Sequence, residues 1–226
     1  LRLAASLGPA DLCLCLISGG GSALMESPAP GITLDDMIAL TRELSGAGAS
    51  IQQLNAVRRA LSRFKGGGLR RACRAGRLIA LILSDVLGDD LATIASGPTI
   101  DVAPDPAAAA GVLRDLGVDA TPAGQRALGV LNMNRTSPPV EAPATSKTTN
   151  LVIGNNAAAV DAAGVVAERL GYSHAMDAAA VSEGPAEEVG VHLARMMQSM
   201  RTGSGPDCLI TGGEPMLYAE LIPVCD

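Results

Sequence analysis

Aromatic side chains are scarce in this sequence of 226 residues, which contains no Trp, one Phe and two Tyr. A basic surplus is also missing, because 17 Lys and Arg residues stand against 23 Asp and Glu and leave a formal net charge of -6. Proteins that bind nucleic acids need cationic surface and rings on which bases stack. We therefore expect no nucleic-acid partner.

Long apolar runs are absent as well. No stretch approaches the roughly 18 apolar residues of a membrane-spanning helix, and the first residues lack the charged-then-apolar order of a signal peptide. The five cysteines show no metal-ligand spacing, and we expect Cys13 and Cys15 to pack on one face of a strand. These features predict reduced thiols, a cytoplasmic location and no membrane partner.

The sequence does contain apolar runs of strand length that alternate with helical segments. The runs cover residues 12–17, 78–83, 151–153 and 208–210. Such alternation indicates an α/β fold with a mainly parallel sheet, in which ligands bind at the carboxyl ends of the strands. We expect the runs at 12–17 and 78–83 to be buried, since parallel strands are covered on both faces.

Two capping-box pairs mark helix starts. Thr33 with Asp36 predicts a helix to about residue 44, and Ser50 with Gln53 predicts a second helix to about residue 64. The glycines at 66–68 are expected to end this second helix.

Residues 134–147 are rich in Pro, Ser and Thr and predict a linker. The linker separates two predicted domains, residues 1–140 and residues 148–226. Because the chain begins with Leu1 rather than Met, we expect it to be a fragment.

Three glycines between two serines follow the first strand, as Ser18, Gly19, Gly20, Gly21 and Ser22. Glycine amides can approach an anion with no Cβ in the way, and the hydroxyl groups add donors. The loop has neither the Lys of a Walker A motif nor the spacing of a dinucleotide-binding fingerprint. Two interpretations stay open: a phosphate- or carboxylate-binding loop, or a tight connection between strand and helix.

A polar stripe runs along the predicted helix 50–64 and contains Asn55, Arg58, Ser62 and Lys65. It lies about a quarter-turn from an apolar stripe. Arg offers a planar fork and Lys a point charge to a carboxylate or phosphate. An ordinary solvated helix surface is the alternative interpretation.

Aspartates gather after the strand at 78–83, where Asp85, Asp89 and Asp90 occur within six residues. Carboxylates clustered beside an anion-binding loop repel one another unless a cation intervenes, so the pattern indicates a Mg²⁺ site. Asp90 precedes an apolar run and is alternatively a helix cap. In the second domain, Asn155 either caps the helix that follows it or contacts a ligand.

Six segments resemble, in the same order, the glycerate kinase family that carries the MOFRL domain. They are LISGGGSALMESPAPGITLDD, LNAVRRALSRFKGGGL, LILSDVLGDDLATIASGPT, VIGNNAAAVDAAGVVAERLGY, SEGPAEEVG and CLITGGE. The resemblance implies an ATP- and Mg²⁺-dependent kinase that phosphorylates D-glycerate, commonly at its 2-hydroxyl. It also implies a Rossmann-like first domain and a second, here incomplete, α/β domain of MOFRL type.

The resemblance extends to individual positions and to partners. Glycerate and ATP are the implied partners, and a homodimer is compatible with it. The match supplies these positions, and the roles are our own inference from the residue types. We expect Arg58, Lys65, Asp85 and Asp89 to be catalytic. We expect substrate or phosphate binding by Ser18, Gly19, Gly20, Gly21, Ser22, Asn55, Asn155, Glu183 and Glu214, and metal binding by Asp85, Asp89 and Asp90.

Two departures from the family pattern support the expectation of a fragment. Family members have a further N-terminal portion with a glycine-rich, lysine-containing segment, and an arginine-bearing segment follows the Gly-Gly-Glu block. Two other functions stay open. Some relatives are named hydroxypyruvate reductase, although the dinucleotide fingerprint is missing. A non-catalytic module that binds a sugar acid or phosphosugar would keep the glycine loop without needing the aspartates.

Overall fold

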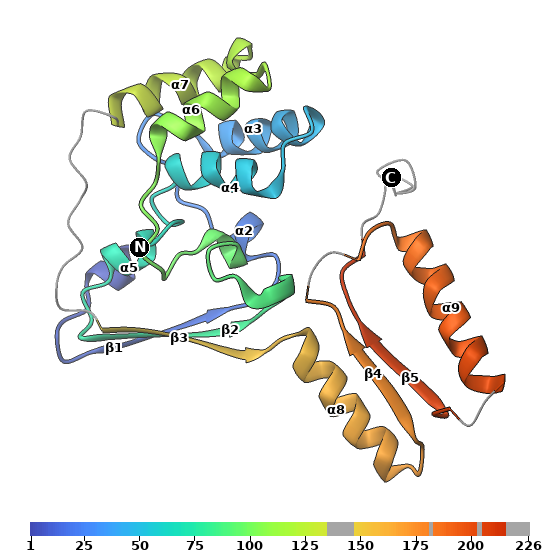
Figure 1. Cartoon of the computed structure of the whole chain (residues 1–226). Coiled ribbons are helices and arrows are strands. Elements are labelled where there is room, and N and C mark those ends of the chain that lie inside the picture. The colour runs from blue at the N-terminus through green and yellow to red at the C-terminus, as the bar shows by residue number, and fades with distance from the viewer. Residues whose placement is uncertain (135–146, 181–182, 203–204, 216–226) are drawn as a thin grey trace. The chain divides into compact units, whose positions relative to one another are not determined.

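The chain folds into two compact units (Figure 1). The structure, a computed structural model, describes residues 1–134, 147–180, 183–202 and 205–215. Unit 1 comprises Leu1–Leu83 and Asp90–Ile153, and unit 2 comprises Ser84–Asp89 and Gly154–Asp226. The predicted linker falls almost entirely on residues 135–146, which lie outside the described residues.

Unit 1 contains a three-stranded sheet in the order β1 (Leu12–Ile17), β2 (Arg77–Leu83), β3 (Lys147–Gly154). β1 and β2 are parallel, with Leu12 opposite Arg77. β3 runs in the same direction, because the Lys147 amide donates to the Gly76 carbonyl at the start of β2 (3.2 Å) and the Ser84 amide donates to the Gly154 carbonyl at its end (2.8 Å). The parallel α/β class is confirmed.

The helices of unit 1 pack around a core that is rich in leucine and alanine. Its most deeply buried large side chains include Leu40, Leu44, Val57, Leu61, Leu113 and Leu131. The helices are α1 (Arg2–Ala5), α2 (Gly21–Leu24), α3 (Leu34–Gly46), α4 (Ile51–Ala60), α5 (Gly68–Ala72), α6 (Pro106–Asp115) and α7 (Pro122–Asn134), with short 3₁₀ turns η2 (Ile94–Ser96) and η3 (Val118–Ala120). Both predicted capping boxes are present, at the starts of α3 and α4.

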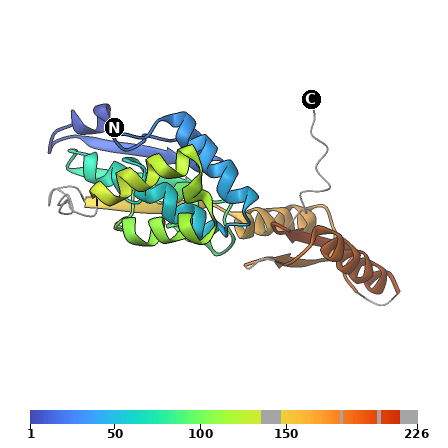
Figure 2. The same cartoon turned by 90° about the horizontal axis from the view of Figure 1, so that it is seen from above.

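One face of the sheet is uncovered in the described part of the chain. Leu12, Leu14 and Leu16 are 57%, 56% and 69% exposed, and the helices of unit 1 lie on the opposite side of the sheet (Figures 1 and 2). The prediction that β1 is buried is therefore wrong for its leucines. Cys13 and Cys15 alternate with them and pack against the core, as predicted, and burial raises the pKa of Cys13 to about 11.

Helix α4 ends at Ala60, four residues earlier than the sequence predicts. The Ser62 hydroxyl accepts hydrogen bonds from the amides of Phe64 (3.1 Å) and Lys65 (3.2 Å), and the Arg63 amide donates to the Ser27 carbonyl (2.7 Å). These bonds replace the helical pattern with a turn. Ser62 and Lys65 therefore do not lie on the α4 surface with Arg58.

Unit 2 pairs two parallel strands, β4 (His174–Ala178) and β5 (Cys208–Gly212), with two helices, α8 (Asn156–Arg169) and α9 (Ala186–Thr202). A 3₁₀ turn, η1 (Leu87–Asp89), belongs to the same unit. Helix α8 packs closely on the strands at Gly164, where a Cβ would lie 2.4 Å from the sulfur of Met176. Within the described ranges, no helix has the length and apolar character needed to cross a membrane.

The structure places the boundary between the units differently from the sequence. β3 joins unit 1 because it pairs with β2, whereas residues 84–89 join unit 2. A sequence pattern shows that a strand exists but not which sheet it enters. The composition break near residue 140 therefore could not show that β3 belongs to the sheet of unit 1.

Asp36 is expected to make the stability of unit 1 sensitive to acid. Its side chain is buried. Hydrogen bonds donated by the Arg126 side chain and by the Thr33 backbone amide lower the pKa of Asp36 to about 2. Since its ordinary pKa is 3.8, the unfolded chain takes up the proton first as the pH falls. The stabilisation is present above pH 3.8, amounts to about 2 kcal/mol, and is lost between pH 3.8 and about 2.

Urea unfolding between pH 2 and pH 7 tests this expectation. Asp36→Asn should lower the free energy of unfolding by about 2 kcal/mol at pH 7 and by progressively less below pH 4. The matched control is Asp35→Asn, which changes an exposed carboxylate in the same helical turn. A loss for Asp36→Asn that stays constant across this pH range would contradict the assigned role.

Candidate functional site

The glycine loop after β1 comprises residues 18–22, and contacts within the protein account for more of its glycine content than the sequence indicates. Gly20 has a φ of +76°, and a Cβ on the buried Gly21 would lie 2.9 Å from the Cβ of Ala95. The Gly21 amide donates to the Ser18 carbonyl (3.3 Å), so it is engaged within the loop. Ser18, Gly19 and Gly20 are exposed. Helix α2 has only four residues and adds little dipole to this loop.

A cavity of about 210 Å³ opens beside the loop, and we call it the arginine pocket. It is lined by Ser22, Ala23, Glu26, Leu34, Met37, Ile38, Thr41, Arg42 and Arg58. Helix α4 supplies Arg58, whose Nη2 donates to the Thr41 hydroxyl (3.4 Å), while α3 forms the apolar wall. Burial lowers the pKa of Arg58, whereas the charge of Glu26 raises the pKa of Arg58. The guanidinium stays charged.

Lys65 forms an ion pair with Glu26 beside this pocket. Its Nζ lies 2.6 Å from Glu26 Oε2 and also donates to the Met25 carbonyl (2.9 Å). The Lys65 side chain is fully buried and the Glu26 side chain is 9% exposed. Burial lowers the pKa of Lys65, and the hydrogen bond with Glu26 opposes that shift. Lys65 therefore neutralises Glu26 and does not line the pocket, which leaves Arg58 and Arg42 as its cations.

Asn55 is buried and reaches the glycine loop through an intermediate residue. Ser96 donates to Asn55 Oδ1 (3.0 Å), and the hydroxyl groups of Ser96 and Ser22 lie 3.0 Å apart. Asn55 and Ser96 are 3% and 0% exposed. The structure thus brings together Ser22, Asn55 and Arg58 as one part of the predicted site.

Unit 2 contains a second cavity, of about 400 Å³, which we call the aspartate pocket. The residues that line it include Ser84, Asp85, Gly88, Asp89, Asn155, Asn156, Ala179 and Glu214. Asn155 has both predicted roles, since its Oδ1 accepts from the Ala158 amide (2.9 Å) at the start of α8 and its Nδ2 donates to Asp89 Oδ2 (2.5 Å). Four of the predicted site residues, Asp85, Asp89, Asn155 and Glu214, therefore share one cavity.

Two other predicted residues lie outside the lining of this cavity. Asp90 belongs to unit 1 and caps a turn, because its carboxylate accepts from the Ala92 amide (3.0 Å) and the Thr93 hydroxyl (2.6 Å). These bonds support the capping interpretation of Asp90. The Glu183 carboxylate lies against Gly213, where a Cβ would be 1.9 Å from Glu183 Oε2.

The aspartate pocket fits Mg²⁺ better than a metal that needs a full set of protein ligands. Among the described residues, no group of three or more His, Cys, Asp or Glu side chains is arranged to hold a metal ion. Mg²⁺ in enzymes commonly keeps several waters and takes one or two carboxylates together with phosphate oxygens. Asp85 and Asp89 suit that pattern, whereas the capping bonds occupy Asp90.

Sequence reasoning missed Glu26, Thr41, Arg42 and Ser96. Glu26 lies within the segment that follows the glycine loop, but its partner Lys65 is 39 residues away and no spacing rule connects them. Ser96 belongs to the Ser-Gly-Pro-Thr run after the aspartates, a pattern that indicates a turn. Its burial and positive φ became visible only in the structure.

The chain is similar to a known protein family and to several named proteins. Residues 1–129 match the family model of a domain of unknown function, DUF4147. The chain is 35% identical to the glycerate kinases of Mus musculus and Homo sapiens, over 97% of its own length and 49% of theirs. It is 37% identical to an Agrobacterium vitis protein provisionally named hydroxypyruvate reductase, over 92% of the chain and 53% of that protein.

A crystal structure of glycerate kinase from Thermotoga maritima has the same fold. It aligns with a TM-score of 0.75 and 32% sequence identity, over 96% of this chain and 51% of that one. The chain therefore spans about half the length of the relatives that it matches. These similarities confirm the resemblance to glycerate kinases that the sequence segments indicated.

Proposed function

This chain belongs to the DUF4147 family, whose model matches more than half of it, and on that premise we propose that the full-length protein transfers a phosphoryl group from ATP to D-glycerate. The arginine pocket carries the proposal, because it combines a half-buried cation with hydroxyl groups and an apolar wall in a volume suited to a small organic acid. The relatives named glycerate kinase support it. We assign 2-phosphoglycerate as the product and, from the free thiols of the described cysteines, a cytoplasmic location.

In this proposal the arginine pocket binds the acceptor substrate. Arg58 pairs with the glycerate carboxylate, because its guanidinium has N–H groups left after the bond to Thr41. Because Lys65 pairs with Glu26, that carboxylate offsets less of the Arg58 charge than an unpaired carboxylate would. Leu34, Met37 and Ile38 contact the carbon chain.

The aspartate pocket serves the nucleotide. Asp85 and Asp89 would hold Mg²⁺, which neutralises charge on phosphate oxygens when it is bound. Asn155 holds Asp89 in place through its amide, and the same Asn155 is fixed by its cap of α8.

Arg58→Ala should lower kcat/KM for glycerate at least about tenfold, because the substrate carboxylate loses its cation. The measurement is ADP release from the full-length protein with glycerate, ATP and Mg²⁺. Arg114→Ala is the matched control, since Arg114 lies in the last turn of α6 and outside the pocket. Wild-type kinetics for Arg58→Ala would remove this residue from the site.

The same preparations separate the rival functions. Oxidation of NADH with hydroxypyruvate, without ADP release from glycerate, would favour the reductase that one group of relatives is named for. Stabilisation by glycerate with no dependence on ATP or Mg²⁺ and no turnover would favour a binding module. ADP release that requires glycerate and ceases when the divalent cation is removed supports the kinase.

A further inference from the structure

A left-handed turn lies beneath Ser22. Ala95, Ser96 and Gly97 have consecutive φ values of +50°, +60° and +65°. Residues other than glycine adopt this conformation at a cost, and such strain persists only where the surroundings enforce it. Here the amides of Gly66 and Gly67 donate to the carbonyls of Ser96 (2.9 Å) and Gly97 (2.7 Å).

Ser96 in this turn belongs to a chain of hydrogen bonds whose direction is set by the acceptor Asn55 Oδ1. A serine hydroxyl has one proton, and Ser96 donates its proton to Asn55 Oδ1 at 3.0 Å. The Ser96 oxygen lies 3.0 Å from Ser22 Oγ. Because its proton is used in the bond to Asn55, Ser96 can only accept a hydrogen bond from Ser22. Ser22 must therefore donate its own proton to Ser96 to complete the bond.

This direction determines what Ser22 offers to the arginine pocket, which it lines. Since its proton points to Ser96, Ser22 presents lone pairs to a ligand and accepts a hydrogen bond from it. Glu26, the carboxylate of the pocket, already accepts from Ser62 (2.5 Å), from its neighbouring amide at Ser27 (2.8 Å) and from Lys65 (2.6 Å). Arg58 and Arg42 supply only donors. The Thr41 hydroxyl donates to the Met37 carbonyl (2.8 Å) and already accepts from Arg58 (3.4 Å).

We propose that Ser22 is a specificity-determining residue that accepts a hydrogen bond from a substrate hydroxyl, and that Ser96 is the positioning residue that directs the Ser22 proton away from the ligand. The arginine pocket then selects hydroxycarboxylates over carboxylates without a hydroxyl, because a ligand lacking that group gives the lone pairs of Ser22 no donor. The inference rests on the proposed function for its choice of carboxylate, and it adds the second group that the pocket recognises.

Calorimetric binding of glycerate and of propionate, without ATP, tests the inference on the full-length protein. The wild type should bind glycerate about tenfold more tightly than propionate. Ser22→Ala should weaken glycerate binding about tenfold and leave propionate binding unchanged, and Ser45→Ala, an exposed serine outside the pocket, should change neither. An equal loss for both acids would show that Ser22 donates to the carboxylate, which overturns the proposal.

Two substitutions at Ser96 separate positioning from structural support. Ser96→Ala removes the hydroxyl and keeps the strained φ, whereas Ser96→Gly removes the hydroxyl and relieves the strain. Our proposal predicts that both lose the preference for glycerate, with a raised KM and a kcat within about twofold of wild type. If Ser96→Gly keeps the preference, the role of Ser96 is structural and the proposal fails.

The outcomes also separate this inference from the kinase proposal. Hydroxyl preference that depends on Ser22, in a protein that releases no ADP, would support the inference and reject the kinase. Phosphorylation of glycerate with a preference that Ser22→Ala does not change would reject the inference alone. A wild type that binds glycerate no more tightly than propionate also overturns it.

Discussion

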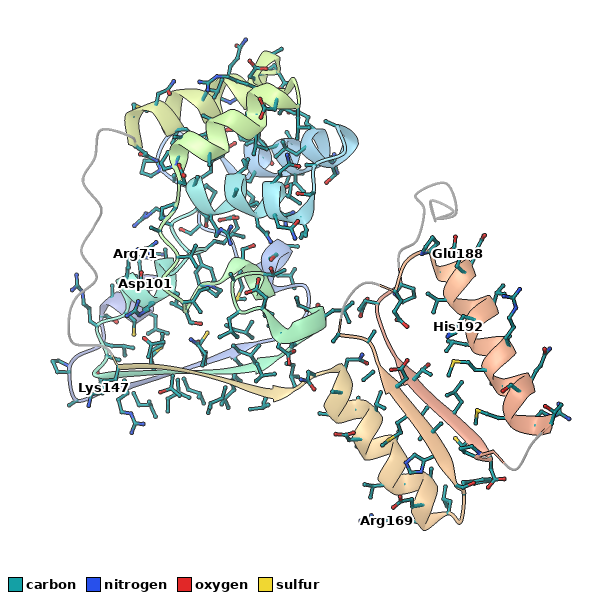
Figure 3. All side chains as sticks on the ribbon, in the orientation of Figure 1. Arg71, Asp101, Lys147, Arg169, Glu188 and His192 are labelled. Atoms are coloured by element: carbon teal, nitrogen blue, oxygen red, sulfur yellow. The ribbon has the colours of Figure 1, made fainter. Side chains whose placement is uncertain are left out.

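Gly67→Ala should destabilise unit 1 by about 3–5 kcal/mol, because the new Cβ meets both a conformational and a steric penalty. Gly67 has a φ of +79°, and a Cβ there would lie 2.2 Å from the Ile100 carbonyl oxygen and 2.8 Å from Arg71 Nη1. Figure 3 labels Arg71 and, near it, Asp101. Burial lowers the pKa of Arg71, and the charge of Asp101 opposes that shift. In a chain of this length the midpoint of thermal unfolding should fall by roughly 10 °C.

Two other glycines separate the contributions to that loss. Gly117→Ala, at φ +70° with no atom within 4 Å, has the conformational penalty alone and should cost about 1–2 kcal/mol. Gly129→Ala, inside α7 and also in open space, should leave stability unchanged or raise it by about 1 kcal/mol. Chemical denaturation of the three variants makes the comparison. Equal losses for Gly67→Ala and Gly117→Ala would show that the contact with Ile100 relaxes at no cost.

Glu26→Ala should cost about 3–5 kcal/mol, because it leaves the Lys65 ammonium buried without a counter-charge. Urea unfolding at pH 7 gives the value. The loss should shrink as the pH rises, since burial lowers the pKa of Lys65 and the neutral amine needs no carboxylate. A loss below about 1 kcal/mol would mean that Lys65 reaches water once Glu26 is removed.

The exposed ion pair between Arg70 and Asp101 is the matched control. Its atoms lie 2.7 Å apart, but the Asp101 side chain is 65% exposed, so Asp101→Ala should cost at most about 1 kcal/mol. A double variant, Glu26→Gln with Lys65→Met, should recover much of the Glu26→Ala loss, because a buried pair replaced by neutral groups of similar size leaves no isolated charge. Failure to recover would point to packing rather than charge.

The parts of the fold that depend on neighbouring residues were predictable from the sequence. The caps of α3 and α4 form within four residues of chain, and β1 covers the predicted residues 12–17. The parts that failed depend on distant partners. Helix α4 ends early because Arg63 bonds to Ser27, and the β1 leucines are exposed because no described helix covers that side. β4 was missed since it is short and contains His174 and Asp177.

The candidate site divides in the same way. Glycines and serines after β1, and aspartates after β2, follow the rule that ligands gather at strand ends, and Ser22, Asp85 and Asp89 do line pockets. Residue type alone could not show that Lys65 is buried in an ion pair, because lysine is rarely fully buried. Nor could it show that Asp90 is occupied as a cap, which needs the positions of Ala92 and Thr93.

The turn at Ala95–Gly97 limits how this site can be redesigned. Its backbone is locally the mirror image of an ordinary right-handed turn, so Val, Ile and Thr, whose branching begins at Cβ, are excluded at positions 95 and 96. Ala95 must also stay small, because its methyl group abuts Gly21. A library meant to alter the choice of substrate should therefore randomise Leu34, Met37 and Ile38 on α3 and keep this turn constant.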